Sequence, residues 1–251
     1  MRVVAIVQAR LNSQRLPKKV LLPLEDKPVL GHVIYRLGYC KTLDEIVVAT
    51  STAIADKEII KWCENNKIKF FCGSLNNVLD RYYQAACHYN ADAIVRITSD
   101  CPVIDPKIVD EVVKGFKSEE YDAYSLAGDF PDGLDCQVFS KSAIFRAWKE
   151  AKLPSEREHV GLFIEKNNRE LFRLGELVKF KGLFHHRWTL DEPEDYEFLK
   201  KIFYKLYRKK KIFYTNDILA LLEKEPKLIN INSGIARNAG LKKSLDKERI
   251  K

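Results

Sequence analysis

Four cationic side chains and two small polar ones occur together in a loop near the start of the chain. The loop follows an apolar run, Met1–Gln8, and contains Arg10, Asn12, Ser13, Arg15, Lys18 and Lys19. Guanidinium groups bind phosphate oxygens in pairs, an ammonium acts as a mobile point charge, and a serine hydroxyl donates a hydrogen bond. Isolated basic side chains are more often solvated surface. The position directly after a buried strand favours an anion-binding site, since open α/β sheets bind phosphorylated ligands at the carboxyl ends of their strands.

Two aspartates are placed to hold a divalent metal ion near that loop. Asp100 and Asp191 each follow a predicted strand and precede a proline, Pro102 or Pro193. Carboxylates repel phosphate unless a cation intervenes, and Mg²⁺ is commonly bound by one or two carboxylates together with phosphate oxygens. Asp191 has a second interpretation, as the N-cap of the helix that begins near Pro193. The two roles do not exclude each other.

A second group of polar side chains lies between Phe130 and His159 and includes Asp132, Asp135 and Gln137, which alternate with apolar neighbours, and the run Glu156-Arg157-Glu158-His159. One helical turn cannot direct all four side chains of that run toward one point. We favour four of these residues as ligands of a second substrate, namely Asp135, Gln137, Arg157 and His159. Glu158 is predicted to complete a capping box with Ser155.

Another polar cluster is formed by His185, His186 and Arg187. Side chains alternate between the two faces of a strand, so at most one of the two histidines is expected in the site, and a structural role for both is favoured.

The spacing of apolar residues predicts alternating strands and helices in the first half of the chain. We expect strands at Val3–Gln8, Glu45–Ala49, Ile68–Cys72 and Ala93–Ile97, and helices at about 29–40, 54–65, 78–89 and 107–118. This alternation indicates an α/β fold with three layers, in which helices cover both faces of a mainly parallel sheet.

The second half departs from this alternation. Gly128, Pro131 and Gly133 indicate an extended loop or hairpin at Tyr121–Phe139, which would insert into the fold and form one wall of a pocket. The remaining patterns predict helices at 140–152, 155–167 and 193–208, strands at 172–179 and 184–190, and then a helix from Thr215, an extended piece at 228–232 and a polar tail.

The composition excludes several classes of function. The formal net charge is +8, but much of the excess lies in runs at 200–211 and 242–251, which are typical of solvated helix faces and tails, so no nucleic-acid partner is expected. The six cysteines form no C-x-x-C pair, which argues against a zinc or redox site. No stretch approaches the ~20 apolar residues of a membrane span, so a cytoplasmic protein is expected.

Several of these motifs resemble the cytidylyltransferases that activate acidic sugars, in particular their spore-coat polysaccharide branch. The resemblance spans nearly the whole chain and rests on Ala9-Arg10, Ser13, Arg15-Leu16-Pro17, Lys19-Val20-Leu21, Val48-Ala49-Thr50-Ser51, Gly73-Ser74, Val78-Leu79-Asp80-Arg81-Tyr82, Arg96-Ile97-Thr98-Ser99-Asp100-Cys101-Pro102, Glu156-Arg157-Glu158-His159 and Thr189-Leu190-Asp191-Glu192-Pro193-Glu194-Asp195. One departure is Lys18, which stands where many relatives have Gly and makes the loop more basic.

The resemblance implies a nucleotide-diphospho-sugar transferase-like fold and an enzyme that transfers CMP from CTP to a small acceptor, releasing pyrophosphate. It assigns nucleotide binding to Ala9, Arg10, Ser13, Arg15, Lys19, Gly73, Ser74, Asp80, Arg81 and Ser99, catalysis to Arg10, Lys19, Asp100 and Asp191, and Mg²⁺ or Mn²⁺ binding to the two aspartates. Arg81 has an alternative role as a helix-surface residue paired with an acid.

We expect one domain over 1–251, with a nucleotide-binding half at 1–120, an acceptor-binding and metal-completing half at 121–214 and a C-terminal extension at 215–251. The oligomeric state stays open, although the relatives implied by the resemblance commonly form homodimers through the region corresponding to about 125–180. The alternative activity is that of a glycosyltransferase with the same fold and a nucleotide-sugar donor. The identity of the acceptor and the choice of CTP over another nucleotide stay open, because related folds do not share one substrate.

Overall fold

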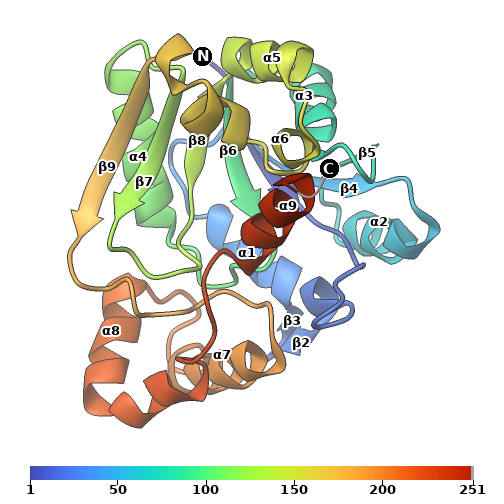
Figure 1. Ribbon diagram of the computed structural model, residues 1–251. Helices are drawn as coiled ribbons and strands as arrows, with labels where there is room; N and C mark the ends of the chain where they lie inside the picture. The colour runs from blue at the N-terminus through green and yellow to red at the C-terminus, as the bar shows by residue number, and fades with distance from the viewer. Residues whose placement is uncertain (250–251) are drawn as a thin grey trace.

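A seven-stranded sheet forms the middle layer of the structure, a computed structural model that describes residues 1–249 (Figure 1). The strand order is β5–β4–β1–β6–β8–β7–β9. The bounds are β1 (Val3–Gln8), β4 (Glu45–Ser51), β5 (Phe70–Gly73), β6 (Ala93–Thr98), β7 (Ala123–Gly128), β8 (Gln137–Ser140) and β9 (Leu174–Phe180). Strand β8 is antiparallel to β6 and β7, and the other neighbouring pairs are parallel. The mainly parallel sheet is therefore confirmed.

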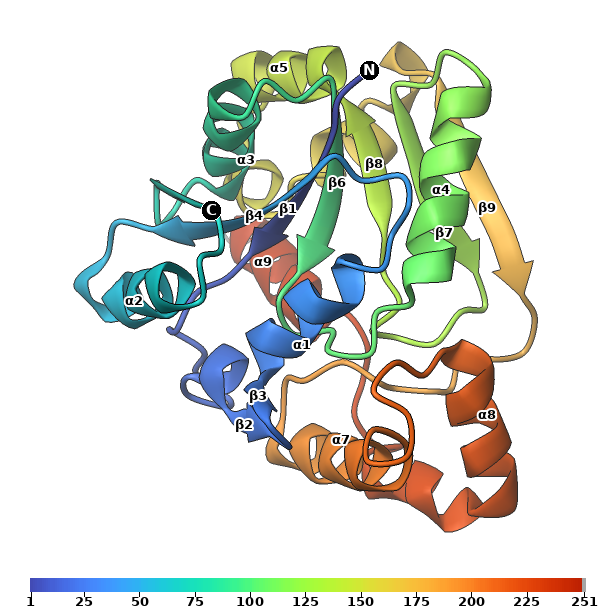
Figure 2. The same ribbon diagram turned by 180° about the vertical axis from the view of Figure 1, so that it is seen from behind.

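Helices cover both faces of this sheet, as Figures 1 and 2 show from opposite sides. One face packs against α1 (Val29–Leu37), α2 (Lys57–Asn65) and α4 (Pro106–Ser118), and the other against α3 (Val78–His88) and α5 (Lys141–Glu150). Helices α7 (Pro193–Leu206) and α8 (Thr215–Lys224) lie beyond the lower end of the sheet in Figure 1 and share the core of the first face. The three layers follow from strands that are apolar on both sides.

The register of the central strands brings two loops together. Gln8 at the end of β1 pairs with Ala49 of β4 on one side and with Thr98 of β6 on the other. Because the three strands are parallel, they end at the same edge of the sheet. The loop after Gln8 and the loop after Thr98 are therefore neighbours, although they are far apart in the sequence.

Short elements complete the frame around this edge. They are η1 (Lys19–Leu21), the small hairpin of β2 (Pro23–Leu24) and β3 (Lys27–Pro28), η2 (Ile54–Asp56), α6 (Pro154–Glu158), η3 (Phe163–Asn167), η4 (Arg169–Leu171), η5 (Pro226–Ile231) and α9 (Ala239–Arg249). None of the helices in the described chain has the length and apolar character needed to cross a membrane. The end of the extension predicted to residue 251, with Lys251, lies outside the described residues.

The first four predicted strands are confirmed with small changes at their ends, and the hairpin prediction for 121–139 is also correct. Its strands β7 and β8 pair within the main sheet. The predicted strand at 184–190 is wrong. That segment crosses the end of the sheet and uses loop partners instead: Trp188 N–H donates to the Asp132 carbonyl at 2.7 Å and Leu190 N–H to the Asp100 carbonyl at 2.8 Å.

Three predictions for the C-terminal half also need correction. The helix expected at 155–167 ends at Glu158, and a π-helical turn, η3, follows Gly161, where an added Cβ would lie 2.6 Å from Glu165 Oε2. The piece expected to be extended at 228–232 is largely the 3₁₀ helix η5. The polar tail folds into α9, which packs against α6.

The basic run on α7 and the loop after it is a solvated surface, as predicted. Its cations form ion pairs with acids of neighbouring elements, namely Lys200–Glu197, Lys205–Glu225, Arg208–Glu25, Lys210–Asp217 and Lys211–Asp26. Such exposed pairs contribute little to stability.

Candidate active site

A cavity of about 710 Å³ opens at the carboxyl ends of β1 and β6, and we call it the first cavity. The loop after β1 contributes Ala9, Arg10, Ser13, Arg15 and Lys19. Other lining residues predicted from the sequence are Arg81, Ser99, Asp100, His159 and Asp191. The parallel register thus assembles most of the predicted nucleotide site.

The loop after β1 is held in place through its main chain and one short side chain. Leu11 N–H donates to Asp56 Oδ1 at 2.7 Å, and Asp56 is buried. Ser13 Oγ accepts the Leu16 N–H at 3.3 Å, so this hydroxyl closes a turn within the loop. Lys18 adopts φ 55°, in the left-handed region that favours glycine. Lys18 makes the same turn as a glycine would, but a glycine adopts this conformation at a lower free-energy cost.

Lys19 lies at the centre of the site. Its Nζ is 2.6 Å from Asp100 Oδ2, 2.7 Å from Asp191 Oδ1 and 2.9 Å from the Leu190 carbonyl oxygen. Burial lowers the pKa of Lys19, but the two carboxylates raise it by more, so the net shift is upward. Burial raises the pKa of Asp100, yet the Lys19 charge and hydrogen bond outweigh it and hold that pKa at about 2. Both partners are therefore ionised at neutral pH.

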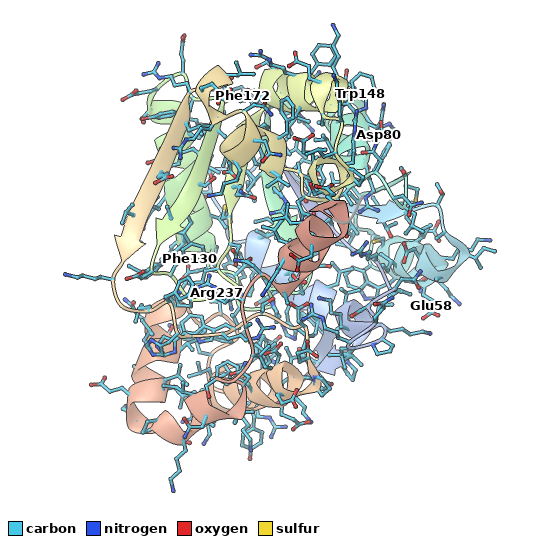
Figure 3. The ribbon with its side chains drawn as sticks, viewed as in Figure 1. Glu58, Asp80, Phe130, Trp148, Phe172 and Arg237 are labelled. Atoms are coloured by element: carbon cyan, nitrogen blue, oxygen red, sulfur yellow. The ribbon has the colours of Figure 1, made fainter. Side chains whose placement is uncertain are left out.

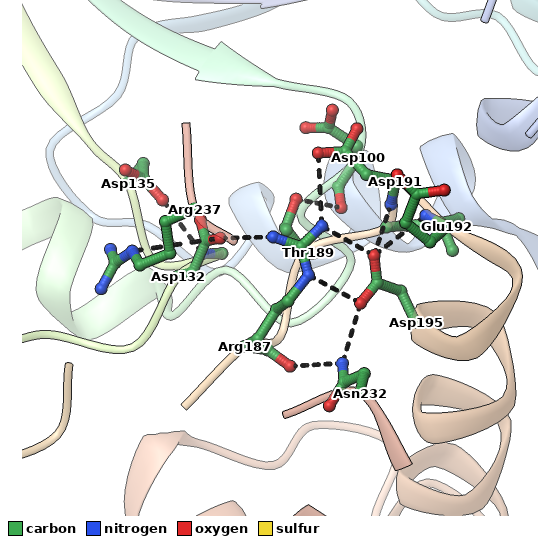
Figure 4. Close-up of polar contacts among 12 residues, drawn as sticks. Asp100, Asp132, Asp135, Arg187, Thr189, Asp191, Glu192, Asp195, Asn232 and Arg237 are labelled. Atoms are coloured by element: carbon green, nitrogen blue, oxygen red, sulfur yellow. Dashed lines mark hydrogen bonds and ion pairs between the residues drawn. The ribbon is translucent and has the colours of Figure 1, made fainter. Parts of the chain in front are cut away.

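The second aspartate is anchored by a buried ionic network behind it (Figure 4). Arg187 donates to both carboxylate oxygens of Asp195 at 2.8 Å and to Asp132 Oδ2 at 3.0 Å. Asn232 Nδ2 donates to Asp195 Oδ1 at 2.8 Å. Asp195 Oδ2 also accepts the N–H groups of Asp191 and Glu192 at 2.9 and 3.0 Å. Glu192, rather than Asp191, is the N-cap of α7, so the N-cap interpretation of Asp191 is wrong.

The residues present fit a divalent cation. Asp100 and Asp191 supply two hard oxygen ligands that are close enough to share one ammonium group. Within the described residues no group of three His, Cys, Asp or Glu side chains is arranged to hold a metal. Two carboxylates completed by phosphate oxygens and water are the arrangement that Mg²⁺ prefers when it binds with a nucleotide.

Arg81 is a buried cation at the wall of the first cavity. Its side chain is 1% exposed, Nη1 donates to the Ser74 carbonyl at 3.2 Å, and Nε has no partner among the described residues. Burial lowers the pKa of Arg81. The interpretation of Arg81 as a helix-surface residue paired with an acid is therefore wrong. A buried guanidinium without a carboxylate partner is suited to an anionic ligand.

Three other predicted nucleotide contacts do not line the first cavity. An added Cβ at Gly73 would lie 3.0 Å from Arg81 Cγ, so the absence of a side chain there makes room for Arg81. Ser74 Oγ accepts the Asn77 N–H before α3. Asp80 accepts the indole N–H of Trp148 at 2.8 Å, and both residues lie at the outer edge of Figure 3. These three residues therefore support the structure around the first cavity and do not line it.

A second cavity of about 430 Å³ lies beside the first and is lined by three predicted acceptor residues, Asp135, Gln137 and His159. Arg96 of β6 lines both cavities, and its Nη1 donates to Gln137 Oε1 at 2.7 Å while Nε has no described partner. Glu165 accepts hydrogen bonds from Gln137 and from Ser125. Arg96 was not selected from the sequence, although a cation within an apolar strand is a usable signal.

Arg157, His185 and His186 do not line either cavity. Arg157 donates to the carbonyl oxygens of Trp148 and Ala151 at 2.7 and 2.6 Å, so it joins α5 to α6. His185 Nδ1 is hydrogen-bonded to the Gly182 carbonyl, and His186 is buried against Trp188. The structural role favoured for both histidines agrees with these contacts, whereas the acceptor role of Arg157 is not supported.

The expected capping box at Ser155 and Glu158 is also wrong. Glu156 Oε2 accepts the N–H groups of Lys152 and Leu153 at 3.0 Å each, which places the cap at Leu153, two residues earlier than predicted. Glu158 is left to face the first cavity, where Oε1 is 3.4 Å from Arg10 Nη2.

Helix α9 contributes residues that sequence reasoning did not select. Ala239, Gly240 and Ser244 line the first cavity, while Leu241 and Asn238, the residue before α9, line the second. The local sequence of α9 is polar and carries no motif, so its position became visible only in the folded chain.

Comparison with known proteins agrees with this geometry. The family model described as "Cytidylyltransferase" matches residues 4–228. The chain is 34% identical over 246 residues to an uncharacterised protein of Methanocaldococcus jannaschii, covering 95% of this chain and 98% of that protein. It is 29% identical over 232 residues to the spore coat polysaccharide biosynthesis protein SpsF of Bacillus subtilis, covering 89% and 95%.

Comparison with a solved structure also indicates the cytidylyltransferase family. The structure of a cytidylyltransferase from Leptospira borgpetersenii superposes with a TM-score of 0.86 at 34% identity, covering 91% of this chain and 97% of the other. This chain and that cytidylyltransferase therefore share their fold over most of their lengths.

Proposed function

Because this chain belongs to the cytidylyltransferase family and is thus a nucleotidyltransferase, we propose that it transfers CMP from CTP to a small acceptor and releases pyrophosphate. The observation that carries the proposal is the cluster of cations and carboxylates in the first cavity, where Lys19 joins Asp100 to Asp191. In the reaction an acceptor oxygen attacks the α-phosphorus and pyrophosphate departs. The enzyme must position the two substrates and neutralise the charge that develops on the leaving group.

The residues have distinct roles in this proposal. Arg10, Arg15 and Lys19 bind the triphosphate, and Arg81 adds a buried cation on the side of α3. Asp100 and Asp191 would hold Mg²⁺ or Mn²⁺, which when bound supplies charge neutralisation at the phosphate oxygens. In the structure, Lys19 Nζ forms ion pairs with both Asp100 and Asp191, and Arg15 Nη2 contacts Asp191 Oδ1 at 3.0 Å.

The acceptor is assigned to the second cavity, where Asp135, Gln137, His159 and Arg96 present both acceptors and donors of hydrogen bonds. We propose an acidic sugar or another small hydroxyl or phosphate compound in the synthesis of a surface polysaccharide or glycan precursor. Arg96 and His159 line both cavities and would lie where the two substrates meet. The cytoplasmic location and a homodimer remain predictions.

The test is a screen of nucleoside triphosphates against small acceptors, read by release of pyrophosphate. CTP with one class of acceptor should give turnover that depends on a divalent cation. The glycosyltransferase alternative predicts no pyrophosphate from any triphosphate and activity with a nucleotide sugar. Calorimetry adds an independent readout: CTP should bind more tightly than CMP and more weakly at high salt, because the loop cations contact the β- and γ-phosphates. Equal affinities for CTP and CMP would reject this triphosphate site.

A further inference from the structure

We propose that α9 is a roof over the active site and that the nucleoside triphosphate binds beneath it. This inference rests on the proposed function, because it takes the first cavity as the nucleotide site. Helix α9 begins at Ala239, beyond residue 228, where the match to the family model ends. That match therefore assigns it no role.

The first observation is that α9 lines both cavities. Gly240 and Ser244 face the first cavity, and Leu241 faces the second. Figures 1 and 2 show α9 on the face of the sheet that also carries α6, across the ends of β1 and β6. A helix in this position limits the space above both substrates and excludes water from the phosphate groups, which strengthens their attraction to the cavity cations.

The second observation is that polar contacts, rather than a packed core, hold α9 in place. Ser244 Oγ donates to Glu158 Oε2 at 3.1 Å and is 3.0 Å from His159 Nε2. One turn later, Glu248 accepts the N–H of Ser155 at 2.5 Å and its hydroxyl at 2.8 Å. None of the described side chains of α9 is buried. A helix held by few half-exposed hydrogen bonds opens at a low free-energy cost.

The segment before α9 is anchored more firmly, which places a hinge between the two. Asn232 is buried in the network around Arg187. Arg237 donates to the Phe130 carbonyl at 2.8 Å and stacks over the Phe184 ring at 4.3 Å, and Figure 3 shows Arg237 beside Phe130. Asn238 follows with φ 57°, where the chain changes direction into α9. The helix can therefore move while the segment up to Arg237 stays in place.

Glu158 connects the roof to the nucleotide site. One of its carboxylate oxygens contacts Arg10, a proposed triphosphate ligand, and the other accepts the Ser244 hydroxyl. Ser244 also contacts His159, which lines both cavities. Ser244 is therefore a positioning residue: it fixes the roof through Glu158 and the imidazole of His159 between the two substrates.

Two glycines provide a matched pair of variants for the test. An added Cβ at Gly240 or at Gly234 meets no atom within 4 Å, so a side chain can begin at either position without displacing a neighbour. Gly240 lines the first cavity, whereas Gly234 is not among its described lining residues. Titration of CTP with Mg²⁺ by calorimetry should give a Kd raised by about tenfold or more for Gly240→Trp and by less than about twofold for Gly234→Trp, where tenfold corresponds to about 1.4 kcal/mol. Both variants should keep the melting temperature of the wild type.

The outcomes separate the roof from the proposed function. No binding of CTP to the wild-type protein would reject the nucleotide site and the roof together. Binding to the wild type, with Gly240→Trp at least as tight as Gly234→Trp, would reject the roof alone. A second variant, Ser244→Ala, tests whether the Ser244 hydroxyl holds α9 in place. This variant should release CTP several-fold faster in stopped-flow measurements at an unchanged melting temperature. An unchanged release rate would show that Ser244 does not hold the roof.

Discussion

At the scale of residues, the site depends on one ammonium group between two carboxylates. Asp100 and Asp191 would repel each other if both were ionised without a cation between them. Lys19 removes that repulsion and keeps the pKa of Asp100 at about 2. The two carboxylates are therefore already held close together before any substrate binds.

This arrangement predicts non-additive losses for the two aspartates. Asp100→Asn and Asp191→Asn should each lower turnover by about 10²-fold or more, because each removes charge directed at the transferring phosphoryl group. The double variant should lose far less than the sum of the two free-energy changes, since both carboxylates act through the same cation. Pyrophosphate release at several Mg²⁺ concentrations measures this.

The control for these variants is Glu58→Gln. Glu58 pairs with Lys18 at the surface and lies at the outer edge of Figure 3. Its turnover should stay within about twofold of the wild type, as is usual for exposed ion pairs. Near-normal turnover of Asp191→Asn would remove Asp191 from the metal site and leave Asp100 alone.

At the scale of elements, the start of α7 positions Asp191. Asp195 does this by accepting the N–H groups of Asp191 and Glu192. Asp195→Ala should lower the free energy of unfolding by about 3–5 kcal/mol, because it leaves the buried Arg187 guanidinium without its bidentate partner. The neighbouring Glu194 is exposed, and Glu194→Ala should change stability by less than about 0.5 kcal/mol. Urea unfolding of the two variants compares them. Equal, small changes would mean that the ionic network does not stabilise α7.

The small hairpin of β2 and β3, next to η1, gives a pH prediction. His32 of α1 is buried, its Nε2 is hydrogen-bonded to the Leu24 carbonyl, and its ring packs on Phe203 and Tyr207. The pKa of His32 is lowered to about 4: burial is the main cause and the charges of Lys27 and Arg36 act in the same direction, whereas the Leu24 hydrogen bond and Asp26 oppose them.

Between about pH 6.5 and 4 the unfolded chain therefore binds a proton that the folded chain does not, so stability falls as the pH falls through this window. His32→Gln retains a donor for Leu24 but cannot be protonated, and its free energy of unfolding should decline less over the same range, by roughly 1–3 kcal/mol. Urea unfolding at pH 7 and pH 4.5 tests this. Parallel pH profiles for the wild type and the variant would contradict it.

At the scale of the whole molecule, one continuous core joins the two halves of the chain. Residues of β1 and α1 pack in the same cluster as Phe198, Phe203 and Leu222 of α7 and α8. We therefore predict a single cooperative unfolding transition, with equal calorimetric and van't Hoff enthalpies. An earlier, separate transition for α7 and α8 would show that these helices form a second domain.

Local sequence determined most of the elements and the main features of the site. The apolar runs of β1, β4 and β6 and the cap of α4 at Asp105 act over a few residues, and the parallel sheet follows from their alternation with helices. Because parallel strands end at one edge, the cationic loop and Asp100 were predicted to meet, as they do.

Tertiary structure decided which side chains face each other within that site. The partners of Lys19 are 81 and 172 residues away, and Ser244 is 86 residues from Glu158. Contact energies at such separations leave no trace in local periodicity. For that reason the sequence left out Arg96 and described α9 as a tail, although the folded chain places it over both cavities.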